Sequence, residues 1–359
     1  MVDSPVHVIV GASLAGAKAA EELRTAGFAG RILLIGEDTE RPYERPPLSK
    51  GYLLGADPRD KAYVHEPDWY DTFGVELLLG VRATGLDRAA HTVLLSGRDP
   101  VHYDKLLLAT GSRVRRLDVP GADLPGVRYL RTLPDADALL ADLPTARRVV
   151  VVGAGWIGLE AAAAARHHGA DVTVVEVDRA PLRRILGDDV AALFAALHRA
   201  HGVTFRFDVG VRGFRADGEG VAALAHPLLG KRIRVEHWSN ALNGGKAAAR
   251  AMLGEPVTYD RVPYFFTDQY DLGMEYAGWV EPGGYDHVVF RGDATIRDGA
   301  PPQFLAFWVS AGRVLAGMNV NVWDVQNDIQ ALVRAGWAGR EVDLARLADP
   351  SVPLHALIP

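Results

Sequence analysis

The sequence predicts an α/β protein that contains two copies of one strand–helix–strand unit, and three observations lead to this class. Glycines and an arginine recur at a constant offset of 142 residues. Each glycine cluster lies between a short apolar run and a segment of helical composition. Of the 359 residues, 48% are apolar and 23% are charged, which is typical of a globular chain. At about 150 residues per domain, the length allows two to three domains.

The composition excludes several kinds of function. No cysteine is present, which excludes disulfides, thiolate metal sites, protein-bound iron–sulfur clusters and a redox-active dithiol. With 39 basic and 45 acidic residues, the chain gives no sign of binding nucleic acid or an anionic membrane. The histidines lack ligand spacing, so we predict no metal site. No secretory signal precedes the first strand, and glycines interrupt the apolar run 149–165, so we expect a cytoplasmic protein without a membrane span.

The first copy begins with an apolar strand at residues 6–10. The turn GASLAG at 11–16 follows, and the next residues predict a helix from Ala17 to Ala26. A second strand at 31–35 leads to Glu37. This is the layout of a dinucleotide-binding βαβ unit, in which glycines allow a tight turn, the helix N-terminus faces a pyrophosphate, and the acid accepts from ribose hydroxyls.

One position of the first turn departs from the usual pattern. Gly11 and Gly16 occupy the first and third glycine positions, whereas Ser13 replaces the middle glycine. Serine is small enough to leave the approach of a pyrophosphate open. The same residues nearly match the G-x-S-x-G turn of α/β-hydrolases, but Ala15 stands where that motif has glycine, so we do not favour a hydrolase.

The second copy repeats this layout from residue 149. An apolar strand at 149–152 leads into the turn GAGWIG at 153–158, a helix runs through His168, and a strand at 171–175 precedes Glu176. A carboxylate at this position accepts from the adenosine 2′-hydroxyl and repels a 2′-phosphate. We therefore expect NADH rather than NADPH.

Five stretches make the sequence similar to a known family: PYERPPLSK (42–50), YDKLLLATG (103–111), GAGWIGLE (153–160), VEHWSNA (235–241) and PYFFTDQYD (263–271). The chain resembles, over nearly its whole length, the FAD-dependent, NADH-oxidising ferredoxin reductases of ring-hydroxylating dioxygenase and bacterial P450 systems, which are relatives of rubredoxin reductase and apoptosis-inducing factor. The resemblance implies two Rossmann-like domains with parallel sheets, one inserted in the other, and a C-terminal α+β interface domain.

The resemblance also implies roles for particular residues. Lys50 would lie beside the flavin, stabilise the charge that develops as hydride arrives, and pair with Glu160; these two are the implied catalytic residues. Trp238 is either a core residue or a neighbour of the flavin ring. The implied FAD-binding residues are Gly11, Ser13, Gly16, Glu37, Arg45, Lys50, Ala109, Thr110, Gly111 and Trp238. The implied NADH-binding residues are Gly153, Gly155, Trp156, Ile157, Gly158, Glu160 and Glu176.

Part of the family's pattern is missing near residues 224–226. A returning strand, whose aspartate holds the FAD ribityl chain in the family, is absent, and the pattern resumes at Pro227. Parallel strands are normally covered on both faces. Either residues 221–224 replace a lost strand, or the domains are distorted, or FAD affinity falls. We expect the fold to survive on both sides of the gap and FAD binding to be weakened.

The expected domains are an FAD-binding domain in two parts (1–117 and 226–256), a truncated NADH-binding domain (118–225) and the interface domain (257–359). The implied function is that of an enzyme: NADH gives hydride to FAD, and the flavin passes single electrons to a [2Fe–2S] ferredoxin that serves a dioxygenase or P450. The alternative is an NAD-binding protein that has lost stable FAD binding and turnover.

Overall fold

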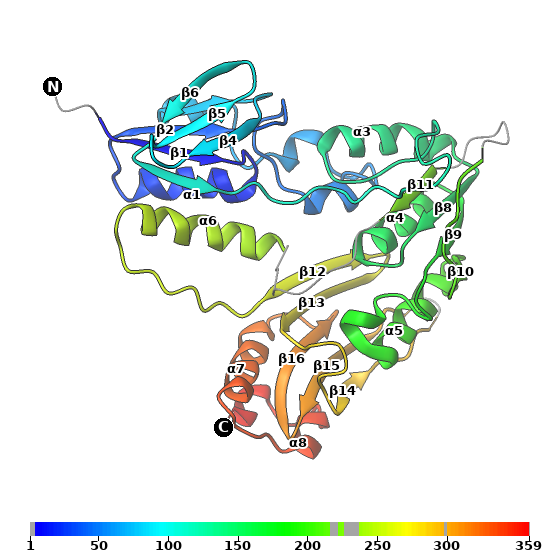
Figure 1. Ribbon diagram of the computed structural model, residues 1–359. Coiled ribbons are helices and arrows are strands. Elements are labelled where there is room, and N and C mark those ends of the chain that lie inside the picture. The colour runs from blue at the N-terminus through cyan, green and yellow to red at the C-terminus, as the bar shows by residue number, and fades with distance from the viewer. Residues whose placement is uncertain (1–3, 216–221, 226–236, 298–299, 359) are drawn as a thin grey trace. The chain divides into compact units, whose positions relative to one another are not determined.

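The computed structural model describes residues 4–215, 222–225, 237–297 and 300–358 (Figure 1). The chain forms two compact units, each assembled from separate stretches of the sequence. Unit 1 comprises Met1–Pro47, Asp57–Arg113 and Ile233–Arg261, and unit 2 comprises Leu48–Ala56, Val114–Arg232 and Val262–Pro359. The three-domain division of the sequence stays a prediction.

Unit 1 contains a parallel sheet with the strand order β3-β2-β1-β7. The helix α1 (Leu14–Thr25) connects β1 (Val6–Val10) to β2 (Arg31–Ile35), which is the predicted first βαβ unit. The other strands of this sheet are β3 (Val75–Leu78) and β7 (Lys105–Leu108). An antiparallel sheet consists of β4 (Ala83–Asp87), β5 (Thr92–Leu95) and β6 (Arg98–His102), and the remaining α-helices are α2 (Trp69–Thr72) and α6 (Trp238–Met252).

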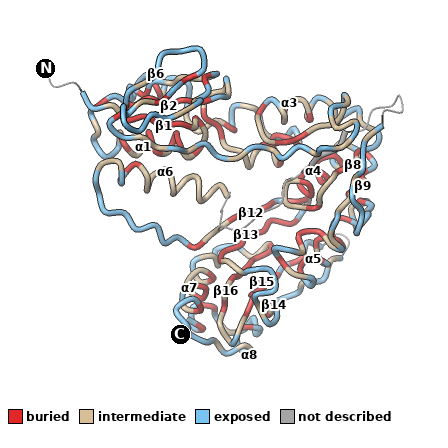
Figure 2. Tube along the Cα trace, in the orientation of Figure 1, coloured by how far each residue is buried: buried red, intermediate tan, exposed pale blue. Residues whose placement is uncertain are grey.

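The core of unit 1 joins segments that are far apart in the sequence. Leu23 of α1, Ile32 and Leu34 of β2, and Ala249 of α6 all belong to one buried cluster. Figure 2 shows the buried residues of β1 and α1 in red. The returning helix α6 therefore completes the core of the first βαβ unit.

Unit 2 contains a second parallel sheet, with the strand order β10-β9-β8-β11. Its outermost strand contains most of the run 221–224 that was expected to replace a lost strand, and residue 221 lies outside the described ranges. β11 (Ala222–Ala225) pairs parallel with β8 (Arg148–Val152), from Ala222 opposite Val149 to Ala225 opposite Val152. The short strand after the second βαβ unit thus covers the open edge of β8. The other elements of this part are α3 (Leu133–Asp142), α4 (Trp156–His167), β9 (Asp171–Val175), α5 (Arg183–Ala200) and β10 (Thr204–Arg206).

The C-terminal part of unit 2 is an antiparallel sheet in the order β12-β13-β16-β15-β14. Helix α7 (Gln326–Trp337) packs on it through Ile329, Leu332 and Val333, which are all buried. The strands are β12 (Tyr264–Gln269), β13 (Leu272–Gly278), β14 (His287–Asp293), β15 (Gln303–Ser310) and β16 (Arg313–Val320), followed by α8 (Leu344–Ala348). Short 3₁₀ helices in the described part of the chain are Pro46–Ser49, Arg59–Ala62, Leu143–Thr145 and Leu354–Leu357.

The structure corrects three predicted element boundaries. Helix α1 begins at Leu14 rather than Ala17, directly after the N-cap residue Ser13. The sequence also predicts a strand at 204–208, whereas β10 ends at Arg206, two residues before Asp208 with its φ of 59°. The sequence predicts a helix from Trp323 to Ala335, whereas α7 starts at Gln326, because Asp324, with a φ of 63°, is outside the helical region.

The internal repeat extends to side-chain contacts. Arg24 Nη1 donates to the carbonyl of Phe28, and Arg166 Nη1 donates to the carbonyl of Ala170, both at 2.6 Å. The two pairs differ by the same offset of 142 residues. Each arginine therefore fixes the loop that leads from the helix into the next strand.

No helix in the described ranges is both long enough and apolar enough to cross a bilayer.

Candidate functional site

Both glycine turns bring backbone into close contact where a side chain would not fit. Gly11 has a φ of 123° and Gly153 a φ of 101°. A Cβ atom on Gly16 would lie 2.1 Å from the Gly11 carbonyl oxygen, and one on Gly158 would lie 2.1 Å from the Gly153 oxygen. The two turns therefore have the same geometry, in which helix and strand approach through glycine.

The helices after these turns leave their first amides open to a ligand. Ser13 is the N-cap of α1 and Gly155 is the N-cap of α4, and neither contributes a side-chain capping bond. No acidic residue lies in the first turn of either helix. Uncapped N–H groups and the positive end of the helix dipole attract a phosphate. Each turn thus has the chemistry of a pyrophosphate site.

Two residues predicted to bind FAD meet in unit 1. The guanidinium of Arg45 donates a short hydrogen bond through Nη1 to Ser13 Oγ, so the serine side chain faces the arginine instead of capping α1. Within the described part of the chain, Arg45 Nε is buried without a hydrogen-bond partner. A cationic donor beside uncapped amides fits an anionic group of a dinucleotide.

Other predicted FAD-binding residues of unit 1 surround the same turn or extend away from it. A Cβ on Gly11 would lie 2.1 Å from the carbonyl oxygen of Ala109, so the backbone that continues to Thr110 and Gly111 begins against the turn. Glu37, at the end of β2, forms an ion pair with Arg82 at 2.9 Å. The side chain of Glu37 is 60% exposed, so its carboxylate is accessible to a ribose.

Trp238 opens helix α6 and belongs to unit 1. Its indole Nε1 donates to Glu44 Oε2 at 2.8 Å, and its side chain is half-buried. Among the residues that the structure describes, Trp238 is not one of the fully buried core residues. The bond to Glu44 fixes the indole beside the segment that carries Arg45.

In unit 2, Glu176 is held by backbone amides. Its Oε2 accepts from Ala154 N at 2.6 Å, inside the second glycine turn, and its Oε1 accepts from Asp178 N at 2.9 Å. The arginines that follow are paired with carboxylates: Arg179 and Arg183 pair with Asp188, and Arg184 pairs with Asp178. The carboxylate is therefore positioned next to the turn, as expected for a residue that recognises ribose.

Lys50 and Glu160 form an ion pair within unit 2. Lys50 Nζ lies 2.8 Å from Glu160 Oε1, and the two side chains are only 14% and 4% exposed. Glu160 is the fifth residue of α4, beyond the first turn, where the helix dipole would favour a carboxylate. Its carboxylate is instead stabilised by side-chain donors, which include Ser49 Oγ on Oε2 and Thr267 Oγ1 on Oε1 at 2.5 Å.

The sequence did not indicate every residue around this pair. Ser49 and Thr267 lie within the stretches that carry the family resemblance, and Thr267 and Gln269 are two residues apart on β12 and so share one face. The alternation of residues along this strand could therefore have indicated that Thr267 and Gln269 lie on the same face. His198 of α5 reaches Gln269 only through tertiary packing, so no local pattern could indicate it.

The aromatic and acidic neighbours define the rest of this region. The ring of Trp156 lies 4.9 Å from that of Phe265, and the Trp156 indole nitrogen is buried without a hydrogen-bond partner in the described part of the chain. Ile157 beside it is half-buried. Partial desolvation raises the pKa of Asp268, and the attraction of Lys50 opposes this change. Of these neighbours, Phe265 is buried and Trp156 and Ile157 are half-buried, whereas Asp268 is exposed.

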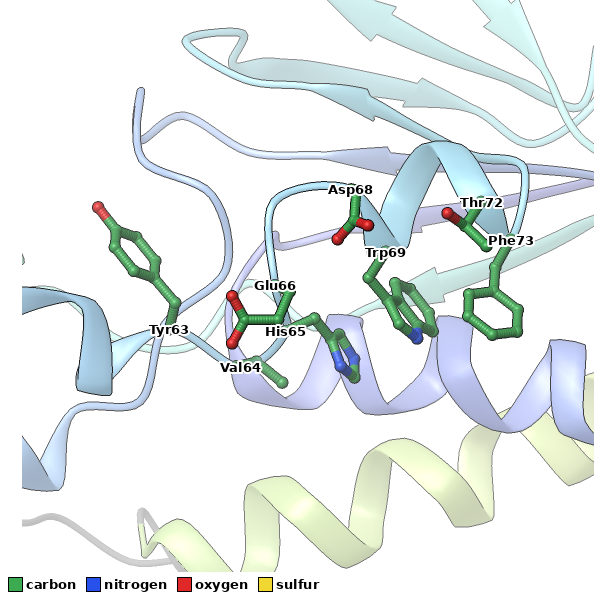
Figure 3. A pocket seen from close by; sticks show the side chains of 8 residues that line it. All are labelled: Tyr63, Val64, His65, Glu66, Asp68, Trp69, Thr72 and Phe73. Atoms are coloured by element: carbon green, nitrogen blue, oxygen red, sulfur yellow. The ribbon is translucent and has the colours of Figure 1, made fainter.

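A separate hollow lies on unit 1 (Figure 3), and it contains none of the predicted site residues. Trp69, Phe73 and His65 form its aromatic wall, with His65 stacked on Trp69 at 3.9 Å. The predicted cofactor residues are therefore not part of this hollow.

Two βαβ units with uncapped helix N-termini, each followed by a carboxylate, define a protein built to bind two dinucleotides. Residues 5–237 match the pyridine nucleotide-disulphide oxidoreductase family, and residues 264–358 match the reductase C-terminal family. The chain belongs to the pyridine nucleotide-disulphide oxidoreductase family. With no cysteine in its sequence, this member has no dithiol of its own.

Relatives named as ferredoxin reductases match nearly the whole chain. It is 34% identical to the 5,5′-dehydrodivanillate O-demethylase ferredoxin reductase subunit of Sphingobium sp., over 98% of this chain and 97% of the relative. It is also 34% identical to the ferredoxin–NAD(+) reductase component of the anthranilate 1,2-dioxygenase system of Burkholderia cepacia, over 98% of both chains. The putidaredoxin reductase in a covalent complex with putidaredoxin has a TM-score of 0.87 and 30% identity, covering 98% of this chain and 97% of that one.

Proposed function

We propose that this protein is a flavoprotein oxidoreductase that transfers hydride from NADH to FAD and then single electrons to a [2Fe–2S] ferredoxin. The observation that carries the proposal is the buried ion pair of Lys50 and Glu160 in the unit that also holds the second glycine turn. Relatives named as ferredoxin reductases of oxygenase systems support the partner. The ferredoxin would serve a dioxygenase or a P450.

The residues of the chain have distinct tasks in this proposal. Gly11, Ser13, Gly16 and Arg45 would hold the FAD pyrophosphate, with Glu37 on the ribose. When bound, FAD accepts two electrons as hydride and releases them one at a time. Lys50 would present its ammonium to the developing negative charge, and Glu160 would hold that ammonium in place.

The NADH site would be formed by the second turn. Gly153, Gly155 and Gly158 would let the backbone approach the pyrophosphate, with Trp156 and Ile157 in the first turn of α4. Glu176 would accept from the adenosine ribose and repel a 2′-phosphate. The absence of cysteine requires that electrons leave directly from the flavin. We place the protein in the cytoplasm, where NADH is available.

The alternative, an NAD-binding protein without flavin, rests on the missing return segment. The alignment with the Sphingobium relative spans 411 positions, more than the 359 residues of this chain, which supports a deletion. In the described part of the chain, β7 pairs only with β1. The residues from 226 to 236, where the return segment would join, lie outside the described ranges. The relatives favour the reductase, because those named above are ferredoxin reductases.

The visible absorption spectrum of the purified protein, before and after anaerobic addition of NADH, tests the proposal. We expect a flavin band that bleaches with NADH and returns when a ferredoxin or an artificial acceptor is added. A colourless protein that cannot be reconstituted with FAD, but still binds NADH, would overturn the proposal and establish the alternative.

A further inference from the structure

A chain of buried polar side chains leads away from the ion pair inside unit 2. Thr267 Oγ1 lies 2.5 Å from Glu160 Oε1, Gln269 Nε2 lies 3.1 Å from Thr267 Oγ1, and His198 Nε2 lies 2.8 Å from Gln269 Oε1. Thr267 and His198 are completely buried, and Gln269 is 1% exposed. Burying three polar groups is costly unless each one is fully hydrogen-bonded, so this chain has a definite arrangement of donors.

Proton counting fixes the direction of every bond in the chain. The ionised carboxylate of Glu160 can only accept hydrogen bonds, so the single hydroxyl proton of Thr267 must be donated to it. The Thr267 oxygen can then only accept from Gln269, whose amide nitrogen must face it. The amide oxygen of Gln269 is left facing His198, which must therefore carry its proton on Nε2.

Two further residues contact His198 or its neighbour, at the end of the polar series farthest from Glu160. The hydroxyl of Tyr270 lies 3.4 Å from His198 Nδ1, the nitrogen that the proton count leaves as an acceptor. The ring of Tyr270 stacks on His201 at 3.7 Å. Tyr270 has a φ of 57°, a left-handed conformation that costs roughly 1–2 kcal/mol for a residue other than glycine. The packing of its side chain maintains this conformation.

We propose that His198 and Gln269 are positioning residues for the Lys50–Glu160 pair. By fixing the orientation of the Gln269 amide, His198 directs the Thr267 proton onto Glu160. Without His198, the amide of Gln269 can turn over and offer its oxygen to Thr267, which then has two acceptors for one proton. The expected effect on the rate of flavin reduction rests on the proposed reductase function. The expected tautomer of His198 does not.

The first experiment measures flavin reduction by NADH in a stopped-flow instrument. We expect Gln269→Met to lower the limiting rate constant about tenfold and to change the dissociation constant of NADH less than twofold, because the position of the Lys50 charge matters mainly as charge develops. Gln303→Leu, an exposed position on β15 of the same sheet, is the matched control. Equal losses in rate and affinity, or no loss in rate, would overturn the proposal.

A double-mutant cycle separates positioning from general damage to the core. Gln269 acts on the ion pair only through Thr267, so the double variant Thr267→Val with Gln269→Met should reduce flavin no more slowly than Thr267→Val alone. Additive losses of rate would contradict the series of hydrogen bonds from Gln269 through Thr267 to Glu160. If Gln269→Met does not fold, His198→Met replaces it in the cycle. His198→Gln, which keeps an N–H donor, should recover most of the rate that His198→Met loses.

The second experiment does not depend on flavin. Nitrogen-15 NMR of the ring-labelled protein, with His198→Gln to assign the signals, should show His198 as the neutral tautomer protonated on Nε2. Protonation on Nδ1 would overturn the proposal even if the enzyme is active. A flavin-free protein that still shows the Nε2 tautomer would overturn the proposed function and leave the structural chain intact.

Discussion

Lys50 and Glu160 are 110 residues apart in the sequence, yet their charged atoms are separated by 2.8 Å. Lys50 lies in the nine-residue segment Leu48–Ala56, which belongs to unit 2 although the residues on either side of it belong to unit 1. The pair is nearly closed to water, so its two charges interact with little screening.

Replacing Glu160 by glutamine should destabilise the protein by about 3–5 kcal/mol, because Lys50 would remain buried without a countercharge. Urea unfolding at pH 7 measures this change. Glu76→Gln is the matched control: Glu76 pairs with Arg31 at 2.7 Å, but both side chains are 48% exposed, so the loss should stay below about 1 kcal/mol. Equal losses for the two variants would show that burial of the Lys50 pair has no energetic role.

Adjacent glycines in α6 should respond in opposite ways to alanine. A Cβ on Gly245 would lie 2.2 Å from the carbonyl oxygen of Ala15 in α1, whereas a Cβ on Gly244 would meet no atom within 4 Å. We expect Gly245→Ala to push α6 away from the first turn of α1 and to lower the ratio of bound FAD to protein. Gly244→Ala should keep that ratio and raise stability by up to about 1 kcal/mol.

The flavin absorbance per mole of purified protein measures both glycine variants. The substitutions are one residue apart in the same helix, so helix propensity cancels in the comparison. Similar flavin content in the two variants would argue against close packing of α6 on α1 as a requirement of the FAD site.

Glu176→Gln should shift cofactor preference toward NADPH. Removing the negative charge removes the repulsion of a 2′-phosphate, while the amide oxygen can still accept from Ala154 N. We expect the kcat/KM ratio of NADPH to NADH to rise about tenfold. Asp171→Asn removes an exposed carboxylate from the other end of β9 and should leave the ratio unchanged. A ratio that does not move in Glu176→Gln would exclude Glu176 as the discriminating residue.

His198 makes the stability of the protein depend on pH. Burial lowers the pKa of His198 from 6.5 to about 4, with a smaller lowering from His201, while the bond to Gln269 opposes both. Between pH 6.5 and about 4, the unfolded chain therefore binds more protons at this residue than the folded protein does. The free energy of unfolding should fall as the pH falls through this range, by roughly 3 kcal/mol from this residue.

Urea unfolding at pH 7 and pH 5 tests this prediction. His198→Gln, which cannot titrate, should lose less stability between the two values than the wild-type protein loses. His287→Gln removes an exposed histidine from β14 and should keep the wild-type dependence. A wild-type profile in His198→Gln would mean that another group accounts for the pH dependence.

The sequence predicted the parts of the site that depend on local pattern. The glycine turns at 11–16 and 153–158, and the carboxylates Glu37 and Glu176, follow directly from residue spacing, since tight turns and strand ends are local features. The pairing of Lys50 with Glu160 came from family resemblance, and the structure confirms the contact. Spacing alone could not have indicated it, because two different segments must fold before these atoms meet.

The remaining residues required the tertiary fold. His198 lies on the buried face of α5, which has the sequence pattern of an ordinary core-facing helix. Only the tertiary contact between α5 and β12 brings it to Gln269. A replacement strand at 221–224 was one of three outcomes considered for the missing segment, and the pairing of Ala222–Ala225 with β8 agrees with it. Weakened FAD binding stays a prediction. Sequence pattern identifies a short apolar run, but the partner of that run depends on which sheet edge is open.

Helix α6 also affects how the protein forms during its synthesis. Ala249 of α6 packs with Leu23 and Ile32 in the core of unit 1, so this core lacks one wall until α6 has left the ribosome. By then the second βαβ unit, residues 148–176, has already emerged. A nascent chain folds its completed parts first, so the unit that begins the protein should be among the last to close. Truncation before α6 should therefore yield a chain that aggregates through the exposed face of α1.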